Sequence, residues 1–427
     1  MTKPAATQND TATVGAQFIA PEASPEYSQN VGESGWRACK LGSTGRTITG
    51  KTPSKDNPED WGSEVLFITP SDYKNYGKKA FSSIRMLSKI GVEKQKNRFL
   101  PIRSVLVTCI GSDMGKTVIN ALPCVTNQQI NAIIPDQEKV DSDYLYYVTK
   151  DLYETLSSLG SDGTAVPILN KSDFENIDIL LPPLPEQKAI AAVLSSLDDK
   201  IDLLHRQNQT LEAMAQTLFR QWFIEEARED WEESSLLELI ELVGGGTPKT
   251  SEPMYWDGVI PWLSGGDIAA NHKGFVNSTQ KSITVEGLNN SSTKLLPKFS
   301  TVISARGTVG KYCLLSEEMA FSQSNYGILP KVENCYFFTN LLIGYAVDEL
   351  QSAAYGSVFD TITTSTFKEA VFLIPPFEKI LQFEKMISFQ FVKQLSNQKQ
   401  IKTLTQLRDM LLPKLMSGEI RVEVEYE

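Results

Sequence analysis

The strongest constraint on the fold of this 427-residue chain is an internal duplication. Landmark residues in the first half recur 195 positions later, and a further group recurs after 193 positions. The first group pairs Thr52 and Pro53 with Thr247 and Pro248, Trp61 with Trp256, Asp72 with Asp267, Gly115 with Gly310, Gln128 with Gln323, and Pro135 with Pro330. The second group pairs Ser172 and Phe174 with Ser365 and Phe367, and Pro182 and Pro183 with Pro375 and Pro376. Residues of such different chemistry do not keep one register by chance, and so long a period indicates duplicated domains instead of short solenoid repeats. Two copies of a binding unit suggest a ligand with two half-sites.

Each copy is expected to be a globular part followed by a long helix. The expected segments are a tail at 1–34, a first globular copy at 35–185, a first spacer helix at 186–228, a second globular copy at 229–377 and a second spacer helix at 378–422. The tail is rich in Ala, Thr, Gln, Pro and Ser without periodicity, so we expect it to be mostly disordered. The first copy mixes β-like runs at 65–68, 104–110 and 177–181 with one helical patch near 142–156, which is an α+β pattern.

The first helical segment carries apolar residues at the spacing of a coiled coil. Core-type residues alternate at intervals of 4 and 3, and no Gly or Pro interrupts them before Glu226. This seam consists of Ile190, Leu194, Leu197, Ile201, Leu204, Asn208, Leu211, Ala215, Leu218 and Trp222. A continuous helix of about 40 residues would be about 60 Å long. Asn208 has two open interpretations: it fixes register and partner, or it is a tolerated polar residue on an imperfect seam.

The second helical segment has the same spacing but a more polar centre. Its seam consists of Ile380, Phe383, Ile387, Ile401, Leu404, Leu411 and Leu415, with Gln390, Gln394 and Asn397 in the middle. Pro413 is expected to kink or end this helix, and Gly418 to close it. Because two helices of similar length leave the two globular copies, we predict that they pair as a coiled coil and hold the copies apart.

Composition indicates a cytosolic protein with real cores. The apolar fraction is 41%, yet no run of about 18 apolar residues predicts a membrane span. The start of the chain lacks the charged and apolar regions of a signal peptide. Five cysteines without a CxxC pair favour a reduced compartment. His205 and His272, the only histidines, are expected to have structural or surface roles, so a His-based triad or metal site is not expected.

The charge is unevenly distributed. The net charge of −11 argues against a simple nucleic-acid binder. Residues 36–117 nevertheless carry 15 Lys and Arg against 7 Asp and Glu, whereas residues 231–377 carry 9 against 15. The first copy therefore has a basic front half, and the second copy is acidic as a whole.

Two glycine-containing segments resemble phosphate-binding loops only in part. In Gly111–Thr117, the position that the Walker pattern requires as glycine is Ile110. The matching stretch Arg306–Lys311 lacks the Ser or Thr that would reach Mg²⁺. The paired glycines instead predict tight turns after strands, with two open roles: an approach of backbone N–H groups to a DNA phosphate, or a purely structural turn.

Other catalytic motifs are also incomplete. Pro135–Lys139 has the wrong spacing for a nuclease. Leu181–Leu184 and Ile374–Phe377 lack the leading Asn or Asp of an adenine methyltransferase motif, and their prolines suit the start of a helix. No paired carboxylates, metal-ligand cluster or nucleophile–base arrangement is evident, so we expect no catalytic site in this chain.

The order of the landmarks resembles one known family. The first copy and its helix contribute Trp36, Leu41, Gly42, Thr52, Pro53, Trp61, Gly62, Asp72, Gly111, Gly115 and Gln128, then the strings Leu181–Gln187, Leu204–Asn208 and Leu218–Phe223. The second copy repeats the scheme and ends in the string Leu411–Arg421. Over residues 35–422 this order resembles the specificity subunit of type I restriction-modification systems.

The resemblance implies two similar α+β target recognition domains, separated by two long helices that pair as an antiparallel coiled coil with pseudo-twofold symmetry. Each recognition domain would read one half of a bipartite, asymmetric site in double-stranded DNA. The helices would set the gap between half-sites and dock two modification subunits. S-adenosylmethionine, ATP and Mg²⁺ would belong to the methyltransferase and the restriction or motor subunits, not to this chain. The expected role is a noncatalytic, cytoplasmic DNA-recognition subunit in phage defence.

Candidate DNA contacts are polar and basic residues of the two copies. In the first copy they are Arg46, Thr52, Lys74, Lys78, Lys79, Arg85, Lys94, Lys96, Arg98 and Lys116. In the second copy they are Thr247, Lys249, Lys273, Lys281, Lys294, Arg306 and Lys311. Nonspecific phosphate affinity would come largely from the partner subunits, while this chain supplies contacts to base edges. We expect first-copy replacements such as Lys78→Ala to weaken binding to all sequences, and base-reading replacements to relax one half-site.

Three alternatives stay open at this point. The chain could be the recognition subunit of a related bifunctional enzyme whose other chain both cuts and methylates, which the co-purifying subunit would reveal. It could be a P-loop enzyme with a coiled-coil arm, which saturable ATP binding would reveal. It could also be a pure scaffold whose globular copies bind proteins.

Overall fold

The computed structural model describes residues 35–54, 56–159, 167–355 and 361–423. The chain divides into two compact units, the first formed by Met1–Asp198 with Arg408–Glu427 and the second by Asp199–Leu407. Each unit is described by itself. The expected disordered tail, 1–34, lies outside the described residues. The domain boundaries expected from the sequence stay predictions.

The globular part of the first unit contains three sheets. A two-stranded sheet pairs β1 (Arg37–Lys40) with β11 (Asp178–Leu181). A five-stranded sheet has the order β2 (Gly45–Thr49), β10 (Ile130–Pro135), β7 (Val105–Thr108), β8 (Thr117–Asn120) and β5 (Lys79–Ala80). A four-stranded sheet has the order β3 (Trp61–Gly62), β6 (Arg85–Leu87), β4 (Val65–Ile68) and β9 (Cys124–Thr126). The helices are α2 (Lys89–Lys94), α3 (Ser142–Asp151), α4 (Tyr153–Leu159) and α5 (Lys171–Glu175).

The globular part of the second unit also contains three sheets. β12 (Glu233–Ser235) pairs with β22 (Val371–Leu373). The five-stranded sheet has the order β13 (Ile240–Gly244), β21 (Asn325–Pro330), β18 (Thr301–Ser304), β19 (Tyr312–Leu315) and β15 (Phe275–Val276). The four-stranded sheet has the order β16 (Lys281–Ile283), β14 (Trp256–Leu263), β20 (Met319–Phe321) and β17 (Leu295–Leu296). The helices are α7 (Gly265–Ala270), α8 (Val285–Asn289), α9 (Tyr336–Tyr355) and α10 (Thr364–Glu369).

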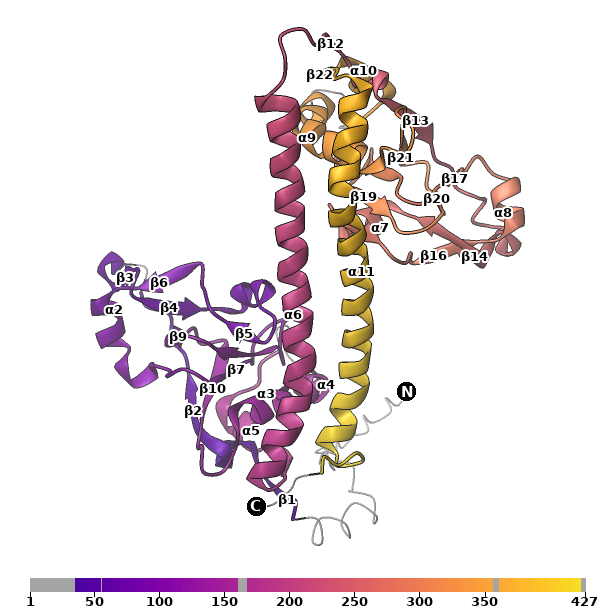
Figure 1. Ribbon diagram of the computed structural model, residues 1–427. Coiled ribbons are helices and arrows are strands. Elements are labelled where there is room, and N and C mark those ends of the chain that lie inside the picture. Colours follow the sequence, from indigo (N-terminus) through magenta and orange to yellow (C-terminus); the bar gives the residue numbers. More distant parts are fainter. Residues whose placement is uncertain (1–34, 55, 160–166, 356–360, 424–427) are drawn as a thin grey trace, which may run out of the picture. The chain divides into compact units, whose positions relative to one another are not determined.

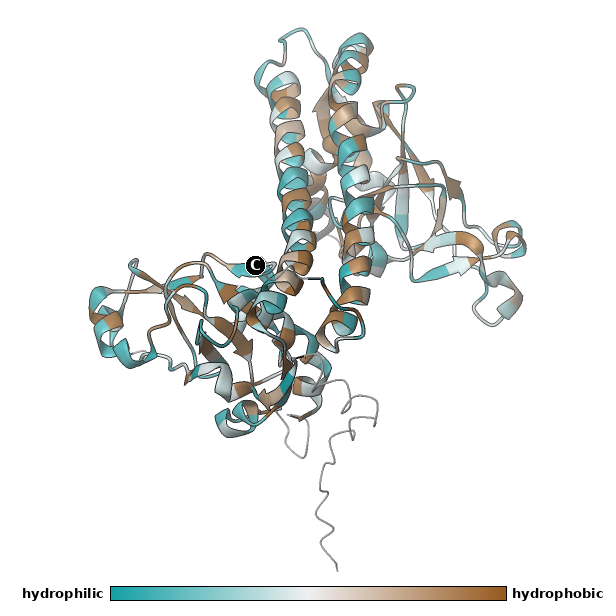
Figure 2. Cartoon of the chain, turned by 60° about the horizontal axis from the view of Figure 1, so that its bottom comes forward, coloured by the Kyte–Doolittle hydropathy of each residue, from teal (hydrophilic) through white to brown (hydrophobic). Residues whose placement is uncertain are grey.

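The equal strand orders of the two five-stranded sheets confirm the duplicated α+β fold. The four-stranded sheets differ, because the single strand β14 takes the place of β3 and β4 and the sheet gains β17. In both copies the landmark tryptophan begins a strand of the four-stranded sheet, and the landmark aspartate completes a capping box at the start of a short helix. Strands of both copies are largely apolar, as Figure 2 shows by their brown colour. The pattern follows from burial, because strands covered on both faces read as continuous apolar runs.

Two long helices occupy most of the segments 186–228 and 378–422, in which the sequence predicts helices. α6 (Leu184–Arg220) begins one residue before Pro185, where a proline fits the first turn, and a π-helical turn follows at Gln221–Glu225. α11 (Phe377–Met416) continues three residues beyond Pro413, so this proline lies in the last turn instead of ending the helix. Gly418 has a φ of 76°, the left-handed conformation that commonly follows a helix.

In the first unit, the start of α6 packs antiparallel to the end of α11. Ile190 and Leu194 of α6 share one buried cluster with Leu412 and Leu415 of α11. One turn further along α6, Asp198 accepts a hydrogen bond of 2.8 Å from Arg408, which lies one turn earlier on α11. Residue numbers rise along α6 as they fall along α11, which defines an antiparallel pair.

The second unit continues the same pairing. Asn397 of α11 donates a hydrogen bond of 2.8 Å to Asn208 of α6, and Phe383 packs edge-on against Phe219 with 6.1 Å between ring centroids. Figure 1 shows the parts of α6 and α11 that belong to the second unit running beside each other. The predicted polar centre of the second seam is real, because Asn397 is fully buried. The bond to Asn397 favours the interpretation of Asn208 as a register residue.

The seam near the end of α6 includes two residues that the heptad pattern missed. Phe219 and Phe223 are buried, whereas the predicted Leu218 and Trp222 pack at the edge of the same cluster. A straight α-helix has 3.6 residues per turn, so a strict 3.5-residue pattern drifts around it. After several heptads this drift turns the residue that follows the predicted one toward the core, as Phe219 follows Leu218 and Phe223 follows Trp222.

Candidate nucleic-acid interface

In the first copy, the four-stranded sheet carries an exposed cation on an aromatic platform. The ring of Trp61 meets buried Phe67 edge-on, with 5.1 Å between centroids. The Arg85 guanidinium lies 4.5 Å from the centre of the Trp61 ring. Stacking on an aromatic face restrains the guanidinium and leaves its N–H edge available for a phosphate or a base.

The second copy has the same arrangement with a lysine. Trp256 meets Trp262 edge-on at 5.2 Å, and the Lys281 ammonium lies 5.4 Å from the centre of the Trp256 ring. Both cations were candidates from the sequence, but their aromatic partners come from other strands. The duplication could have indicated these aromatic partners, since Trp61 and Trp256 are landmark residues and lie in equivalent strands.

Several other candidate cations of the first copy are held by carboxylates of their own domain. Lys94 forms ion pairs with Asp60 at 2.6 Å and with Glu59 at 3.1 Å. The pairs Lys96–Glu93 and Lys116–Asp113 also lie within hydrogen-bond distance, at 2.7 Å and 2.6 Å. The pairs of Lys96 and Lys116 are exposed and therefore weak, so a DNA phosphate can compete for these two lysines, whereas Lys94 is bound to the buried carboxylate of Asp60.

Lys78, which we expected to contact DNA at the surface, is buried. Its side chain is buried, and its ammonium lies 2.6 Å from Asp143 and donates a hydrogen bond of 2.6 Å to Ser195 of α6. It also lies 4.7 Å from the centre of the Tyr147 ring. A buried, paired ammonium cannot reach a DNA phosphate without breaking these contacts, so we remove Lys78 from the candidate DNA contacts. Its role here is to attach the globular part to α6.

The remaining first-copy candidates lie at the surface in separate places. Arg46 on β2 lines a polar hollow together with Lys139 and Lys171. Lys74 and Lys79 are exposed near β5, and Arg98 is half-buried. Thr52 is half-buried and donates a hydrogen bond of 2.8 Å to landmark Gln128. The structure therefore does not gather these residues around Arg85.

The second-copy candidates also spread over several loops. Thr247 and Lys249 precede β14, and the Lys249 carbonyl accepts a hydrogen bond of 3.1 Å from Trp256. Lys294 is exposed between α8 and β17. Lys273 lines a cleft with residues of α6, which places it against the helix. Arg306 is exposed after β18, and Lys311 is half-buried before β19.

The glycine-containing loops are structural turns. Gly111 and Gly115 have φ values of 94° and 87°, and Gly310 has 79°. The Gly115 N–H bonds to the Thr108 carbonyl at 2.8 Å, and the Gly310 N–H bonds to the Ser304 carbonyl at 3.0 Å. Because these amides are used inside the loop, they are not presented to a phosphate, which favours the structural interpretation and argues against a P-loop enzyme.

A further buried carboxylate, which the sequence pattern did not indicate, joins a globular part to a helix. Glu384 of α11 is only 8% exposed and accepts hydrogen bonds from the N–H groups of Phe337, at 3.0 Å, and Phe338, at 2.7 Å. These N–H groups belong to the first turn of α9, where they have no partner inside the helix. Burial raises the pKa of Glu384 from 4.5 to about 7.

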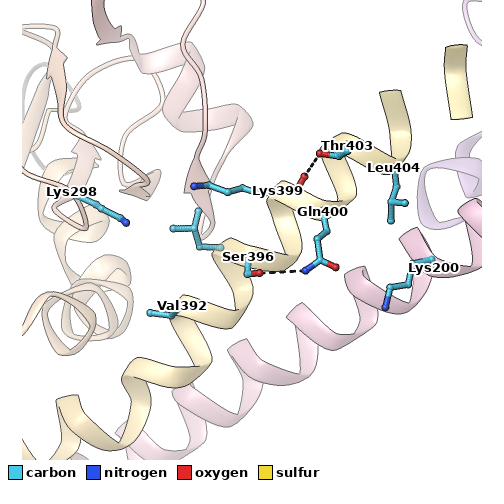
Figure 3. A pocket seen from close by; sticks show the side chains of 9 residues that line it. Lys200, Lys298, Val392, Ser396, Lys399, Gln400, Thr403 and Leu404 are labelled. Carbon is cyan, nitrogen blue, oxygen red and sulfur yellow. Dashed lines mark hydrogen bonds between the residues drawn. The ribbon is translucent and has the colours of Figure 1, made fainter. Parts of the chain in front are cut away.

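The surface of the paired helices in the second unit contains an open groove. It is lined by Lys200 of α6, by Lys298 of the globular part, and by residues of α11. Figure 3 shows Val392, Ser396, Lys399 and Leu404 along α11. Lys200 lies on the neighbouring helix α6, and Lys298 lies in the globular part. The groove therefore combines apolar contact area with three ammonium groups.

Other site types find no support in the part of the chain that the structure covers. Among the described residues, no group of three or more His, Cys, Asp or Glu side chains could hold a metal ion. The five cysteines are all free thiols, and burial raises the pKa of Cys109 to about 12. None of the helices built from described residues has the length and apolar character that a membrane crossing needs.

Comparison with known proteins agrees with this geometry. The model of a family described as the type I restriction modification DNA specificity domain matches residues 33–213 and 228–411. The type I restriction enzyme MjaIX specificity subunit of Methanocaldococcus jannaschii is 28% identical over 412 residues, which are 91% of this chain and 94% of that protein. The HindI specificity subunit of Haemophilus influenzae is 23% identical and aligns with 91% of this chain and 100% of its own length. A solved S subunit of a type I restriction-modification system from M. genitalium has the same fold, with a TM-score of 0.60 at 16% identity, covering 91% of this chain and 97% of that one.

Proposed function

We propose a function for this chain from one premise: it belongs to the type I restriction modification DNA specificity family, whose model covers both of its copies. The chain is the noncatalytic subunit that recognises the DNA sequence in a type I restriction-modification complex. The observation that carries the proposal is the agreement between the two matched segments and the two copies, each with a cation on a landmark tryptophan. Chemistry on the DNA then belongs to partner subunits.

The target is a bipartite, asymmetric site in double-stranded DNA. Each copy reads one half-site, because each contains the same five-stranded sheet and the same cation–aromatic arrangement. The half-sites differ in sequence, because the exposed side chains of the two copies differ. Arg85 in the first copy and Lys281 in the second are one example, since arginine presents a rigid planar fork of N–H groups and lysine a flexible ammonium.

The paired helices set the distance between the half-sites. An antiparallel pair keeps a fixed length only while its register is fixed. The bond between Asn208 and Asn397 supports one register, because a shift would leave a buried amide opposite apolar residues.

The partners are two modification subunits, with restriction or motor subunits bound to the complex. S-adenosylmethionine, ATP and Mg²⁺ are bound by those subunits. The groove with Lys200, Lys298 and Lys399 is a candidate docking surface for a modification subunit, because it offers apolar area beside positive charge. With a net charge of −11, this chain depends on its partners for most of the phosphate affinity.

Methylome sequencing tests the proposal. Cells that carry the complete system should show adenine methylation at one bipartite motif, and deletion of this chain alone should abolish that motif. Re-expression of the chain should restore it. Methylation that persists at an unchanged motif without this chain would refute the proposal, and the identity of the subunits that co-purify with the chain would distinguish a type I complex from the bifunctional alternative.

A further inference from the structure

In the first copy, the chain makes a bulge between β3, which begins at Trp61, and β4, and both strands pair with β6. Leu87 of β6 lies opposite Trp61 in the pairing with β3, and opposite Val65 in the pairing with β4. Gly62 still pairs with Met86 of β6, so Ser63 and Glu64 are the residues that leave the ladder, and both are exposed. We call residues 61–65 the first bulge.

The second copy has a bulge at the equivalent place. Ile283 of β16 lies opposite both Trp256 and Ile260 of β14, with a shift of register between them. The residues that leave the ladder are Asp257, Gly258 and Val259. We call residues 256–260 the second bulge. Bulges of this kind locally redirect side chains and are enriched beside functional sites.

Both bulges are held in place by close packing of a glycine. A Cβ atom on Gly62 would lie 2.9 Å from the Cα atom of Ser88, and one on Gly258 would lie 2.6 Å from the Cα atom of Thr284. Ser88 and Thr284 are the N-cap residues of α2 and α8. In each copy, a glycine close to the landmark tryptophan therefore packs against the N-cap residue of the next helix, although Gly62 directly follows Trp61 and Gly258 is the second residue after Trp256.

The side chains at the tips of the two bulges differ. The first bulge presents Ser63 and the carboxylate of Glu64. The second bulge presents Asp257, which has a φ of 58°, and Val259, which is 89% exposed. A left-handed non-glycine residue is strained, and such strain concentrates at functional sites. An isopropyl group that is almost fully exposed also has no packing role inside its own domain.

The cations of the aromatic platforms lie on the neighbouring strands. Arg85 lies opposite Phe67, two residues beyond the first bulge, and Lys281 lies opposite Trp262, two residues beyond the second. Neither cation forms an ion pair with a carboxylate of the described residues, unlike Lys94, which is bound to Asp60. Each copy thus combines an anchored cation with two variable side chains on one rigid scaffold.

We propose that the first bulge with Arg85, and the second bulge with Lys281, are the two base-reading sites of this chain, one for each half-site. This inference rests on the proposed function. The cation of each site contacts a phosphate or a guanine edge. The Glu64 carboxylate accepts a hydrogen bond from the amino group of cytosine, and Val259 packs against the methyl group of thymine, because these are the base groups that a carboxylate and an isopropyl group recognise in the major groove.

The test uses the full chain with its modification subunits in cells that lack their own copy of this chain. The variants are Glu64→Gln, Glu64→Ala and Val259→Ala. Matched controls are Glu138→Gln, an exposed glutamate of the first copy outside the bulge, and Val285→Ala, a valine of α8 that is 54% exposed. The methylated motif of each strain is determined by sequencing.

The Glu64 variants should lose discrimination at one base pair of one half-site by roughly 10- to 100-fold, with the other half unchanged. Val259→Ala should relax one base pair in the other half-site, and both controls should keep the full motif. The inference is overturned if the bulge variants leave the whole motif intact, or if the Glu64 and Val259 variants change the same half. In either case the wild-type chain still directs a bipartite motif, whereas failure of the wild-type chain to direct any motif refutes the proposed function itself.

Discussion

The buried carboxylate of Glu384 makes the second unit sensitive to pH. Burial raises its pKa from 4.5 to about 7, so the folded chain holds this proton more tightly than the unfolded chain does. The stability that this proton contributes is fully present below about pH 4.5 and is lost as the pH rises through about 7. At about 1.4 kcal/mol for each pH unit, the loss amounts to roughly 3 kcal/mol.

Replacement of Glu384 by glutamine should remove this pH dependence. The glutamine side chain would be neutral at every pH, but its amide can accept from only one of the two N–H groups of Phe337 and Phe338. The lost bond costs about 1–2 kcal/mol, which is less than the roughly 3 kcal/mol penalty of the buried charge. Glu384→Gln should therefore be less stable than the wild type at pH 5 and about 1 kcal/mol more stable at pH 8.

Hydrogen exchange of the peptide that contains residues 336–347 measures the local stability of α9, whose first N–H groups bond to Glu384. The free energy of opening should fall from pH 5 to pH 8 in the wild type and stay constant in the variant, after correction for the intrinsic exchange rate. If the variant is instead less stable by about 2 kcal/mol or more at pH 8, the ionised carboxylate is the favourable partner of the α9 N-terminus. The argument from burial would then be refuted.

Three further experiments test the packing of the helices. Phe383→Ala removes a fully buried ring and should lower the free energy of unfolding by about 3–5 kcal/mol, whereas Phe389→Ala, at a ring that is 72% exposed, should change it by less than about 0.5 kcal/mol. Arg408→Ala removes the shorter of two ion pairs of the buried Asp198 carboxylate, at 2.8 Å against 3.9 Å for Lys150, while the Tyr147 hydroxyl still donates to Asp198. Thermal unfolding should show a loss of about 1.5–3 kcal/mol. Replacement of both Asn208 and Asn397 by leucine should raise the melting temperature, because an apolar layer replaces a polar one, and a lower melting temperature would contradict that reasoning.

The positions of the long helices were readable from the sequence because they depend on local periodicity. The seam from Ile190 to Leu211 needed no knowledge of the partner, since a helix buries every third or fourth residue whichever surface covers it. Prediction was less accurate at Phe219 and Phe223, where the drift between 3.5 and 3.6 residues per turn decides which side chain is buried.

The candidate site was harder to predict because exposure and pairing depend on residues that are distant in the sequence. Lys78 and Lys79 are neighbours and look equivalent, yet Lys78 is buried against Asp143 and Ser195 whereas Lys79 is exposed. Arg85 differs from Lys94 in a similar way, because one lies on Trp61 and the other is bound to Asp60. A list of basic residues could not separate these cases.

The sequence alone determined the duplication, the two helices and the family, because each of these is a repeated order of residues along one dimension. The tertiary structure alone decided which cations are available, where Glu384 is buried, and that one strand in each copy bulges to present different side chains. These features arise from contacts between strands and helices whose register only the folded chain establishes.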